Sequence, residues 1–197
     1  MVQQEAPVKE RILSAAKSLY AEKGHRETKL REIASEAHTS ESQVVKYFHS
    51  KAGVLDALLI QARSRIQDGF DKIQKENNDP VLVLKSIPSL LLDIFEKDPE
   101  LLKVYLFSAR YYTLIPEEQL NQETRLLKNL TGIFGKIKET NGLRGDLSPE
   151  VLSSLFWGLN LHMFRDKFYA KINPDYHDFS LKEMNAAVEK FLGSFVD

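Results

Sequence analysis

The chain has 197 residues, of which 43% are hydrophobic and 28% are charged, with a formal net charge of −1. This is the composition of an ordinary globular protein, long enough for one domain or for a small domain attached to a larger one. The absence of Cys excludes disulfides and thiolate metal sites, and no apolar run approaches the roughly 18 residues that a membrane span requires.

The first three predicted helices are short and closely joined. Pro7 suits the first turn of a helix, and the apolar stripe of VKERILSAAKSLYAEKG continues until Gly24 ends that helix. Thr28 is the expected N-cap of the second helix, KLREIASEA. Ser40 is the expected N-cap of the third helix, and Gln43, three residues later, completes a capping box.

The later helix boundaries repeat one device, a capping side chain directly before a first-turn proline. The pairs are Asp79-Pro80, Asp98-Pro99 and Ser148-Pro149, and Ser180 with Glu183 forms a capping box before the last helix. The predicted helices therefore lie near 51–76, 79–96, 99–113, 117–140, 149–171 and 180–195. Pro88 is expected to kink or break the second of these. Because no strand pattern is present, we predict an all-α protein of about nine helices, in which the long fourth helix joins a small N-terminal unit to a larger bundle.

The segment ASEAHTSESQVVKYFHSKAGVL has the layout of a helix-turn-helix, in which two short helices around a tight turn are braced by a third. In that motif the second helix enters the major groove of DNA, and its N-terminal residues contact base edges. Val44 and Phe48 share the face that is expected to pack inward, which leaves Lys46 and Tyr47 pointing outward. The helix starts at Thr28 and Ser50 are expected to attract phosphates.

Charge supports this interpretation only weakly. Residues 1–55 carry nine Lys or Arg and seven Asp or Glu, a net of +2, whereas the remaining residues have a net of −3. Because so small an excess does not by itself indicate nucleic-acid binding, the placement of the basic residues carries the interpretation.

The pattern RILSAAKSLYAEKG…TKLREIASEAHTSESQVVKYFHSKAGVL resembles the TetR family of bacterial transcriptional regulators. The resemblance covers about residues 9–55 and includes Ile12, Ala15, Ala16, Leu19, Gly24, Thr28, Ile33, Ala34, Ala37, Ser40, Tyr47, Phe48 and Lys51. The C-terminal part is similar only in its helical architecture. The resemblance implies a homodimeric repressor that binds palindromic operator DNA, is released by a small-molecule effector, and uses the fourth helix to couple the two events. It thus assigns residues 1–52 to DNA binding and residues 53–197 to ligand binding and dimerisation.

The resemblance also implies the DNA-contacting residues. Phosphate contacts are expected at Thr28, Tyr47 and Lys51, and base-facing positions at Glu41, Ser42, Gln43 and Lys46. Gln43 has two competing roles, the helix cap and the reading of adenine. Glu41 either stabilises the helix start as a first-turn acid or accepts from a cytosine amino group. Replacing Lys51 by Ala is expected to weaken operator binding across sequences and to reduce its salt dependence.

The chain departs from the family pattern in the turn, which usually reads Ala-Gly-Val-Ser but here contains His38 and Thr39. Glycine adopts positive φ without penalty, whereas His38 has a cost there. Val45 stands where a Tyr is common, so that one phosphate contact is expected to be lost. These departures leave open a second interpretation, a protein–protein interaction module on the family fold with weak or lost DNA binding.

In the C-terminal part, aromatic and polar residues occur together at helical spacing. They form either ordinary core or the wall of a ligand pocket with a few orienting polar groups. The candidate ligand-binding residues are Phe107, Arg110, Tyr111, Trp157, Asn160 and His162. A buried Arg110 or Arg165 without an acidic partner would favour an anionic ligand.

The last two helices are the expected dimer surface. Their apolar stripes comprise Val151, Leu152, Leu155, Phe156 and Leu159 on one helix and Met184, Ala187, Val188, Phe191 and Leu192 on the other. Such stripes also suit an internal core, and Gly158 would permit close helix approach. A two-fold dimer places its recognition helices about 34–36 Å apart, or somewhat more.

A third interpretation, a helical enzyme or metal carrier, requires clustered inward carboxylates or His. Glu22 and His25 have the spacing of a metal-ligand pair, but Gly24 interrupts the helix between them and the pair is not repeated. We therefore expect no cofactor and no enzymatic activity. The N-terminus lacks the basic start and apolar core of a signal peptide, and we expect a cytoplasmic protein.

Overall fold

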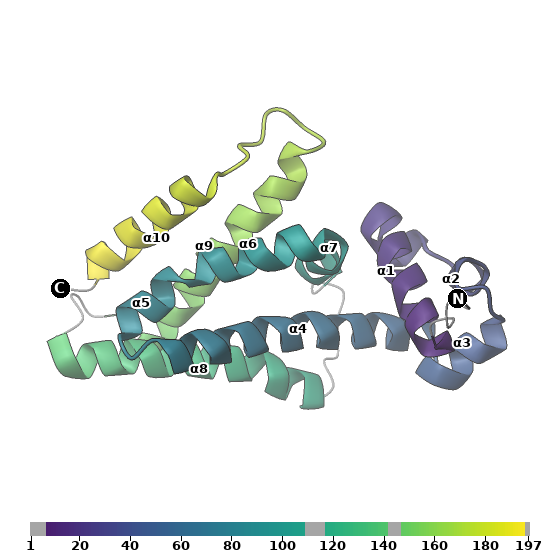
Figure 1. The fold of residues 1–197 in the computed structure, drawn as a ribbon, viewed down its shortest axis with the longest axis horizontal. Coiled ribbons are helices and arrows are strands. Elements are labelled where there is room, and N and C mark those ends of the chain that lie inside the picture. Colours follow the sequence, from purple (N-terminus) through teal and green to yellow (C-terminus); the bar gives the residue numbers. More distant parts are fainter. Residues whose placement is uncertain (1–6, 109–116, 142–146, 196–197) are drawn as a thin grey trace, which may run out of the picture. The chain divides into compact units, whose positions relative to one another are not determined.

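The computed structural model describes residues 7–108, 117–141 and 147–195, without the side chains of 117–123 and 141. Within these ranges the chain forms ten helices and no strand, which confirms the all-α prediction (Figure 1). The helices are α1 (Val8–Glu27), α2 (Leu30–Glu36), α3 (Glu41–Phe48), α4 (Lys51–Glu76), α5 (Pro80–Lys85), α6 (Ile87–Lys97), α7 (Pro99–Ser108), α8 (Glu117–Asn141), α9 (Pro149–Ala170) and α10 (Leu181–Phe195). None of the helices in the described ranges is long and apolar enough to span a membrane.

The predicted helix 79–96 is divided in two, as Pro88 led us to expect. Ser86 lies between α5 and α6, and its amide still bonds to the Leu82 carbonyl at 3.1 Å. Pro88 has no amide hydrogen for the carbonyl of Leu84, so the regular helix cannot continue through this point. Because of this break, the described residues form ten helices where about nine were predicted for the chain.

The predicted caps of the later helices are confirmed. Asp79, Asp98 and Ser148 accept hydrogen bonds from the amides of Val81, Leu101 and Val151, at 2.8, 3.1 and 3.4 Å. At the last helix, the Ser180 hydroxyl accepts from the Glu183 amide while the Ser180 amide donates to the Glu183 carboxylate. Hydrogen bonds from Ser180 and His177 lower the pKa of Glu183 to about 2. Each capping side chain accepts a hydrogen bond from a main-chain amide at the helix start, which has no acceptor within the helix.

The chain divides into two compact units. The first contains the described residues up to Ala62 together with Asp98 and α7. The second contains Arg63–Lys97 and the described residues from α8 onward. The long helix α4 contributes its first part to one unit and its remainder to the other.

In the first unit, α1 packs against α2, α3 and α7. Its core includes Ile12, Ala16, Ile33 and Val44, all without exposed side-chain surface. Asp98 has two roles at the start of α7, because it caps that helix and also forms an ion pair with Lys17 of α1 at 2.9 Å.

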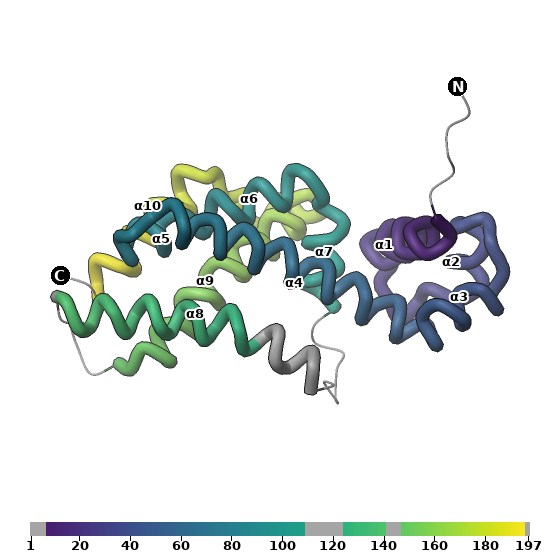
Figure 2. The backbone as a smooth tube through the Cα atoms, turned by 60° about the horizontal axis from the view of Figure 1, so that its bottom comes forward, coloured from purple at the N-terminus to yellow at the C-terminus, as the bar shows by residue number. Residues whose placement is uncertain are grey.

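In the second unit, α8 and α9 lie side by side, as Figure 2 shows. Phe70, Phe134, Phe156 and Phe164 are fully buried in its core. The apolar stripe of α10 mostly belongs to this core, because Met184, Val188 and Leu192 are buried. The stripe of α9 is divided: Leu152 and Phe156 face inward, whereas Val151 and Leu155 are 44% and 49% exposed.

Candidate nucleic-acid interface

The turn between α2 and α3 is a Schellman motif with a histidine at its left-handed position. The Thr39 amide donates to the Ala34 carbonyl at 2.9 Å and the His38 amide to the Ser35 carbonyl at 3.1 Å, and His38 has a φ of 49°. The comparison with the usual Ala-Gly-Val-Ser turn predicted a backbone cost at His38, and the positive φ of His38 confirms this prediction. Left-handed backbone costs a residue with a Cβ roughly 1–2 kcal/mol, although His tolerates this region better than most.

Replacing His38 by Gly is expected to stabilise the protein by about 1 kcal/mol, because Gly adopts this conformation without the Cβ penalty. His38 is exposed, so the substitution removes no core packing. Urea unfolding of the two proteins measures the difference. His38→Ala serves as the control, since it keeps the Cβ, and it should give no comparable gain. Equal stability of His38→Gly and His38→Ala would contradict the strain assignment.

Helix α3 begins at a capped end. The Ser40 hydroxyl accepts from the Gln43 amide at 3.3 Å and shares a 2.8 Å hydrogen bond with the Ser42 hydroxyl. Among the described residues, the Gln43 side chain makes no return bond to the Ser40 amide, so only the first half of the predicted capping box is formed. The Gln43 amide group is therefore not committed to the cap.

Helix α3 presents one buried and one exposed face. Val44 and Phe48 are 0% and 6% exposed and fix the helix in the core of the first unit. On the opposite face Tyr47 and Val45 are each 41% exposed, and Lys46 is also exposed. The remaining predicted DNA-contacting residues of this helix, Glu41, Ser42 and Gln43, lie in its first turn, where Glu41 and Ser42 are exposed and Gln43 is half-buried. Because its apolar face is fixed in the core, α3 can enter a DNA groove with its exposed face.

Thr28 differs from its prediction. It is fully buried, and its hydroxyl donates to the Gly24 carbonyl at 2.8 Å, where φ of Gly24 is 84° and the regular part of α1 ends. The N-cap of α2 is Lys29 rather than Thr28, so the predicted cap was wrong by one residue. The Lys29 amide donates to the Glu32 carboxylate at 2.7 Å, and Glu32 also pairs with Lys23. The Glu32 carboxylate serves as acceptor for the Lys29 amide at the start of α2. The Thr28 hydroxyl does not cap α2 and instead faces α1.

Lys51 connects the start of α4 to the end of α1. Its ammonium group donates to three main-chain carbonyls, those of Thr28 at 2.7 Å, His25 at 2.8 Å and Arg26 at 3.3 Å. An ammonium group has three donors, so these carbonyls account for all of them. The sequence indicated a basic residue near a helix start but not this structural role, because its acceptors are 23 to 26 residues away along the chain.

Tyr20 and His25 complete the same connection. The Tyr20 hydroxyl donates to the Lys51 carbonyl at 3.0 Å, and the rings of Tyr20 and His25 meet edge to face at 5.1 Å. Burial, with a smaller contribution from Asp56, raises the pKa of Tyr20, so its hydroxyl remains a donor. Burial and then the charge of Lys51 lower the pKa of His25, which favours the neutral ring beside the ammonium group.

The candidate ligand-binding residues belong to different units of the chain. Phe107 of α7 lines a hollow of about 310 Å³ in the first unit, formed with the end of α1, whereas Arg110 and Tyr111 lie outside the described residues. In α9 of the second unit, Trp157 and Asn160 are 8% and 0% exposed. The Asn160 amide group donates to the Phe156 carbonyl one turn earlier at 2.9 Å.

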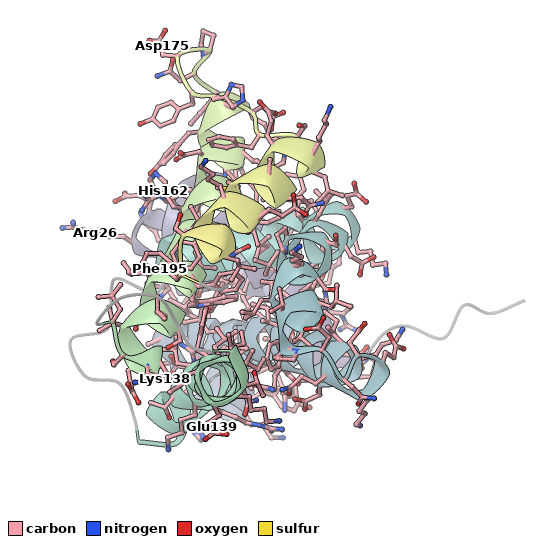
Figure 3. The ribbon with its side chains drawn as sticks, turned by 90° about the vertical axis from the view of Figure 1, so that its left-hand side faces the viewer. Arg26, Lys138, Glu139, His162, Asp175 and Phe195 are labelled. Atoms are coloured by element: carbon pink, nitrogen blue, oxygen red, sulfur yellow. The ribbon has the colours of Figure 1, made fainter. Side chains whose placement is uncertain are left out.

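His162 projects to the outside from α9 (Figure 3). It contacts Arg165 at 2.5 Å and Asp166 at 3.3 Å. It therefore does not share the buried surroundings of Trp157 and Asn160. Arg165, the alternative anion-binding residue of the sequence analysis, is half-buried beside this group.

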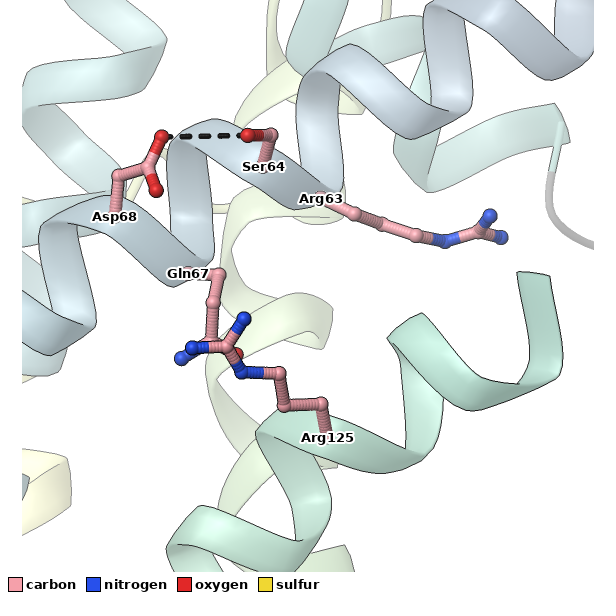
Figure 4. A pocket seen from close by; sticks show the side chains of 5 residues that line it. All are labelled: Arg63, Ser64, Gln67, Asp68 and Arg125. Atoms are coloured by element: carbon pink, nitrogen blue, oxygen red, sulfur yellow. Dashed lines mark hydrogen bonds between the residues drawn. The ribbon is translucent and has the colours of Figure 1, made fainter. Parts of the chain in front are cut away.

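A polar hollow in the second unit was not predicted. Arg63, Ser64, Gln67 and Asp68 of α4 and Arg125 of α8 line a cavity of about 110 Å³ (Figure 4). The signal was present in the sequence, because Arg63 and Gln67 are one turn apart on a helix whose neighbouring turns bury Leu59, Ile66 and Phe70. Among the described residues, no group of three or more His, Asp or Glu side chains is placed to hold a metal ion.

The fold and the α2–α3 geometry define a helix-turn-helix protein, and comparisons with known proteins show what this chain is similar to. Residues 12–58 match the sequence model of the bacterial regulatory proteins of the tetR family. The HTH-type transcriptional regulator YvkB of Bacillus subtilis (strain 168), itself described as uncharacterised, is 25% identical over 163 residues, which cover 79% of this chain and 82% of that protein.

Solved structures agree in fold. SmeT, the repressor of the Stenotrophomonas maltophilia multidrug efflux pump SmeDEF, is 20% identical with a TM-score of 0.73, and the match covers 98% of this chain and 92% of SmeT. AibR, solved in complex with isovaleryl coenzyme A and operator DNA, is 16% identical with a TM-score of 0.73, covering 96% and 98% of the two chains. Residues 12–58 thus carry the helix-turn-helix of the bacterial regulatory proteins of the tetR family, and the fold of the chain is similar to that of SmeT and AibR.

Proposed function

We propose that this regulator is a repressor that binds palindromic operator DNA as a homodimer and is released by a small-molecule effector. The observation that carries the proposal is α3, whose exposed face is free while Val44 and Phe48 fix its other face in the core. In this proposal residues 1–52 bind DNA, and residues 53–197 bind the effector and form the dimer. SmeT is described as a repressor and AibR was solved with operator DNA and isovaleryl coenzyme A, which supports the proposal by analogy.

The proposed DNA contacts lie on the exposed face of α3, in its first turn and at the starts of α2 and α4. The side chains that face the bases are those of Glu41, Ser42, Gln43 and Lys46. Gln43 is available for adenine because the cap does not use its side-chain amide group. Tyr47, which is 41% exposed, is proposed to contact a phosphate through its hydroxyl. Lys51 and Thr28 contribute to the phosphate contacts in this proposal; in the free protein both side chains bond to carbonyls at the end of α1.

The proposed dimer surface is the outward row of α9. Val151 and Leu155 are one turn apart and exposed, and a Cβ added at Gly158 would meet open space beyond its own helix backbone among the described residues. Apolar residues exposed in a row favour a protein contact. A ligand can release the dimer only by favouring a state in which the two recognition helices fit the operator poorly.

The experiment that tests this function is a selection of random duplex DNA by the full-length protein, followed by a binding titration of the enriched sequence. A palindrome with half-sites about one helical turn apart, or a multiple of this distance, is expected for a two-fold dimer. A selection that enriches no palindrome would instead favour the interaction-module interpretation, for which the left-handed His38 and the exposed Val45 are the supporting observations.

Replacing Lys46 by Ala is expected to weaken binding to the selected operator by about 1–3 kcal/mol, because the residue faces DNA from the middle of α3. Its stability should change by less than about 0.5 kcal/mol, since the side chain is exposed. Fluorescence anisotropy with labelled operator measures the affinity. Lys138→Ala, an exposed lysine of α8, is the matched control and should bind as the parent does. Equal affinity of both variants would remove Lys46 from the interface.

A further inference from the structure

The side chains of Tyr20, His25 and Lys51 join the end of α1 to the start of α4, and we call this contact the α1–α4 connection. The Lys51 ammonium group donates to three carbonyls at the end of α1, and the Tyr20 hydroxyl donates to the Lys51 carbonyl at 3.0 Å. Because α2 and α3 lie in the chain between the two connected ends, these contacts help to fix their position.

His25 lies just beyond the point where the regular helix α1 is interrupted. Gly24, directly before it, has a φ of 84°, so the regular helix does not continue into His25. Contacts outside the helix hold the residue instead. Its ring packs edge to face on Tyr20 with ring centroids 5.1 Å apart, and its carbonyl accepts from the Lys51 ammonium group at 2.8 Å. His25 therefore contacts both other members of the α1–α4 connection.

The His25 ring lacks an acceptor for a second proton. Its Nε2 atom is buried and has no hydrogen-bond partner among the described residues. A neutral imidazole has one donor nitrogen, and the ring forms a hydrogen bond with the main chain of Lys51. Protonation makes both nitrogens donors, so the Nε2–H group would be buried without an acceptor. An unpaired buried donor is unfavourable, which opposes protonation of the folded protein.

The surroundings of the ring act in the same direction. Burial, followed by the ammonium charge of Lys51, lowers the pKa of His25 from its ordinary value of 6.5. The hydrogen bond with the Lys51 main chain and the charge of Asp56 oppose this lowering only in part. The other charged residues that line the hollow beside His25 are Glu22, Lys23, Arg26 and Glu27 of α1 and Lys103 of α7. The four on α1 are exposed, so water screens their charges, and Lys103 is a further cation.

We propose that neutral His25 is a positioning residue for the recognition helix α3, and that its protonation at mildly acidic pH loosens the α1–α4 connection and weakens operator binding. A charged ring adds repulsion at the point where Lys51 bonds to the end of α1. The displacement reaches α2 and α3, since both lie between the connected ends. The effect on operator binding rests on the repressor function proposed above, whereas the effect on stability does not.

The direction of the pH effect follows from the proton affinities of the two states. The unfolded chain binds a proton at His25 near its ordinary pKa of 6.5, and the folded chain binds it only at lower pH. The stability due to the neutral ring is therefore complete above about pH 6.5 and is lost as the pH falls through the lower pKa of the folded state. Hydrogen bonds lower the pKa values of Glu32, Glu150 and Glu183 below 4.5, so their contributions are lost only at more acidic pH.

The test compares urea unfolding of the full-length protein and of His25→Asn between about pH 7.5 and about pH 5.5, the range in which histidine titrates. Asn keeps a side-chain donor but cannot gain a proton. We expect acidification to destabilise the parent more than His25→Asn, by up to about tenfold in the folding equilibrium per pH unit. Equal pH profiles of the two proteins overturn the proposal.

The matched control is His38→Asn. His38 is an exposed histidine of the same unit, and its left-handed backbone is one that Asn tolerates. This variant should keep the pH profile of the parent. A profile that flattens in His38→Asn as much as in His25→Asn contradicts the assignment to His25.

A titration of the ring itself decides the outcome if His25→Asn does not fold. The ¹⁵N chemical shifts of the imidazole in the parent protein report its protonation, and His25→Phe, which keeps a ring against Tyr20, identifies the signal by its absence. We expect Nε2 to be unprotonated at neutral pH and the midpoint to lie below 6.5. A midpoint at or above 6.5 overturns the proposal.

Operator binding is measured over the same pH range by fluorescence anisotropy with the selected operator. On acidification, the affinity of the parent should fall relative to that of His25→Asn, by up to about tenfold per pH unit for each protomer. A difference in stability without a difference in operator affinity overturns the role of His25 in positioning α3. Absence of operator binding at every pH removes the repressor function instead, and the unfolding profiles then decide whether His25 controls the α1–α4 connection.

Discussion

Replacing Gly53 by Ala is expected to lower the free energy of unfolding by about 2–3 kcal/mol, although the same change inside a helix usually raises it by about 1 kcal/mol. Gly53 lies in the first turn of α4, and a Cβ there would overlap the main-chain carbonyl oxygen of Phe48. That carbonyl belongs to the last residue of α3 and cannot move alone. It also accepts from the Ser50 amide at 2.7 Å across His49, whose φ is 64°.

Gly53→Ala is also expected to displace the C-terminal end of α3, because the junction between α3 and α4 fixes the position of that end. We expect loss of stability in urea unfolding, a melting temperature lower by roughly 5–10 °C, and weaker operator binding. Gly132→Ala is the matched control: Gly132 is an exposed helical glycine of α8 with no atom within 4 Å of a new Cβ, and it should gain stability. A Gly53→Ala protein that is as stable as Gly132→Ala would contradict the close approach.

Replacing Lys51 by Ala is expected to cost about 2–4 kcal/mol of stability, because three main-chain carbonyls at the end of α1 lose their charged donor. Hydrogen bonds to a charged group are stronger than neutral ones, and here they join the end of α1 to the start of α4. Operator binding should weaken as well, because α2 and α3 lie between these two points in the chain. Urea unfolding and an operator titration measure the two effects.

The dependence of binding on salt separates two roles of Lys51. If its ammonium group contacts a phosphate in the complex, Lys51→Ala reduces the salt slope by about one. If Lys51 acts only through its carbonyl partners, affinity falls while the slope stays unchanged. Lys46→Ala is the control for stability, since its exposed side chain should leave unfolding unaltered. A Lys51→Ala protein of parental stability would show that the three carbonyl bonds contribute nothing.

Local signals predicted the helices well. Proline and capping residues located the starts of α5, α7 and α9, and Gly24 located the end of the regular part of α1. The break between α5 and α6 followed from the missing amide of Pro88, and the left-handed turn at His38 from the family's usual glycine. These features depend on residues within one or two turns of each other, so a single sequence contains the required information.

Features that depend on distant residues were predicted less well. Thr28 satisfied the local rule for an N-cap but instead bonds to the end of α1, because Glu32 supplies the partner that the α2 amide needs. The apolar stripe of α10 suited both a core and a dimer surface, and packing placed Met184, Val188 and Leu192 inside. Periodicity identifies an apolar face but not the element that covers it.

The sequence by itself determined an all-α protein and the helix-turn-helix, because caps, breakers and helical periodicity act locally. Only the tertiary structure decided how Lys51 is used, that Gly53 must lack a Cβ, and that Arg63 and Gln67 share a hollow with Arg125. Arg125 lies 58 residues beyond Gln67, and Lys51 lies 23 residues beyond Thr28. Contacts across such separations arise from packing of whole helices, which no short stretch of sequence encodes.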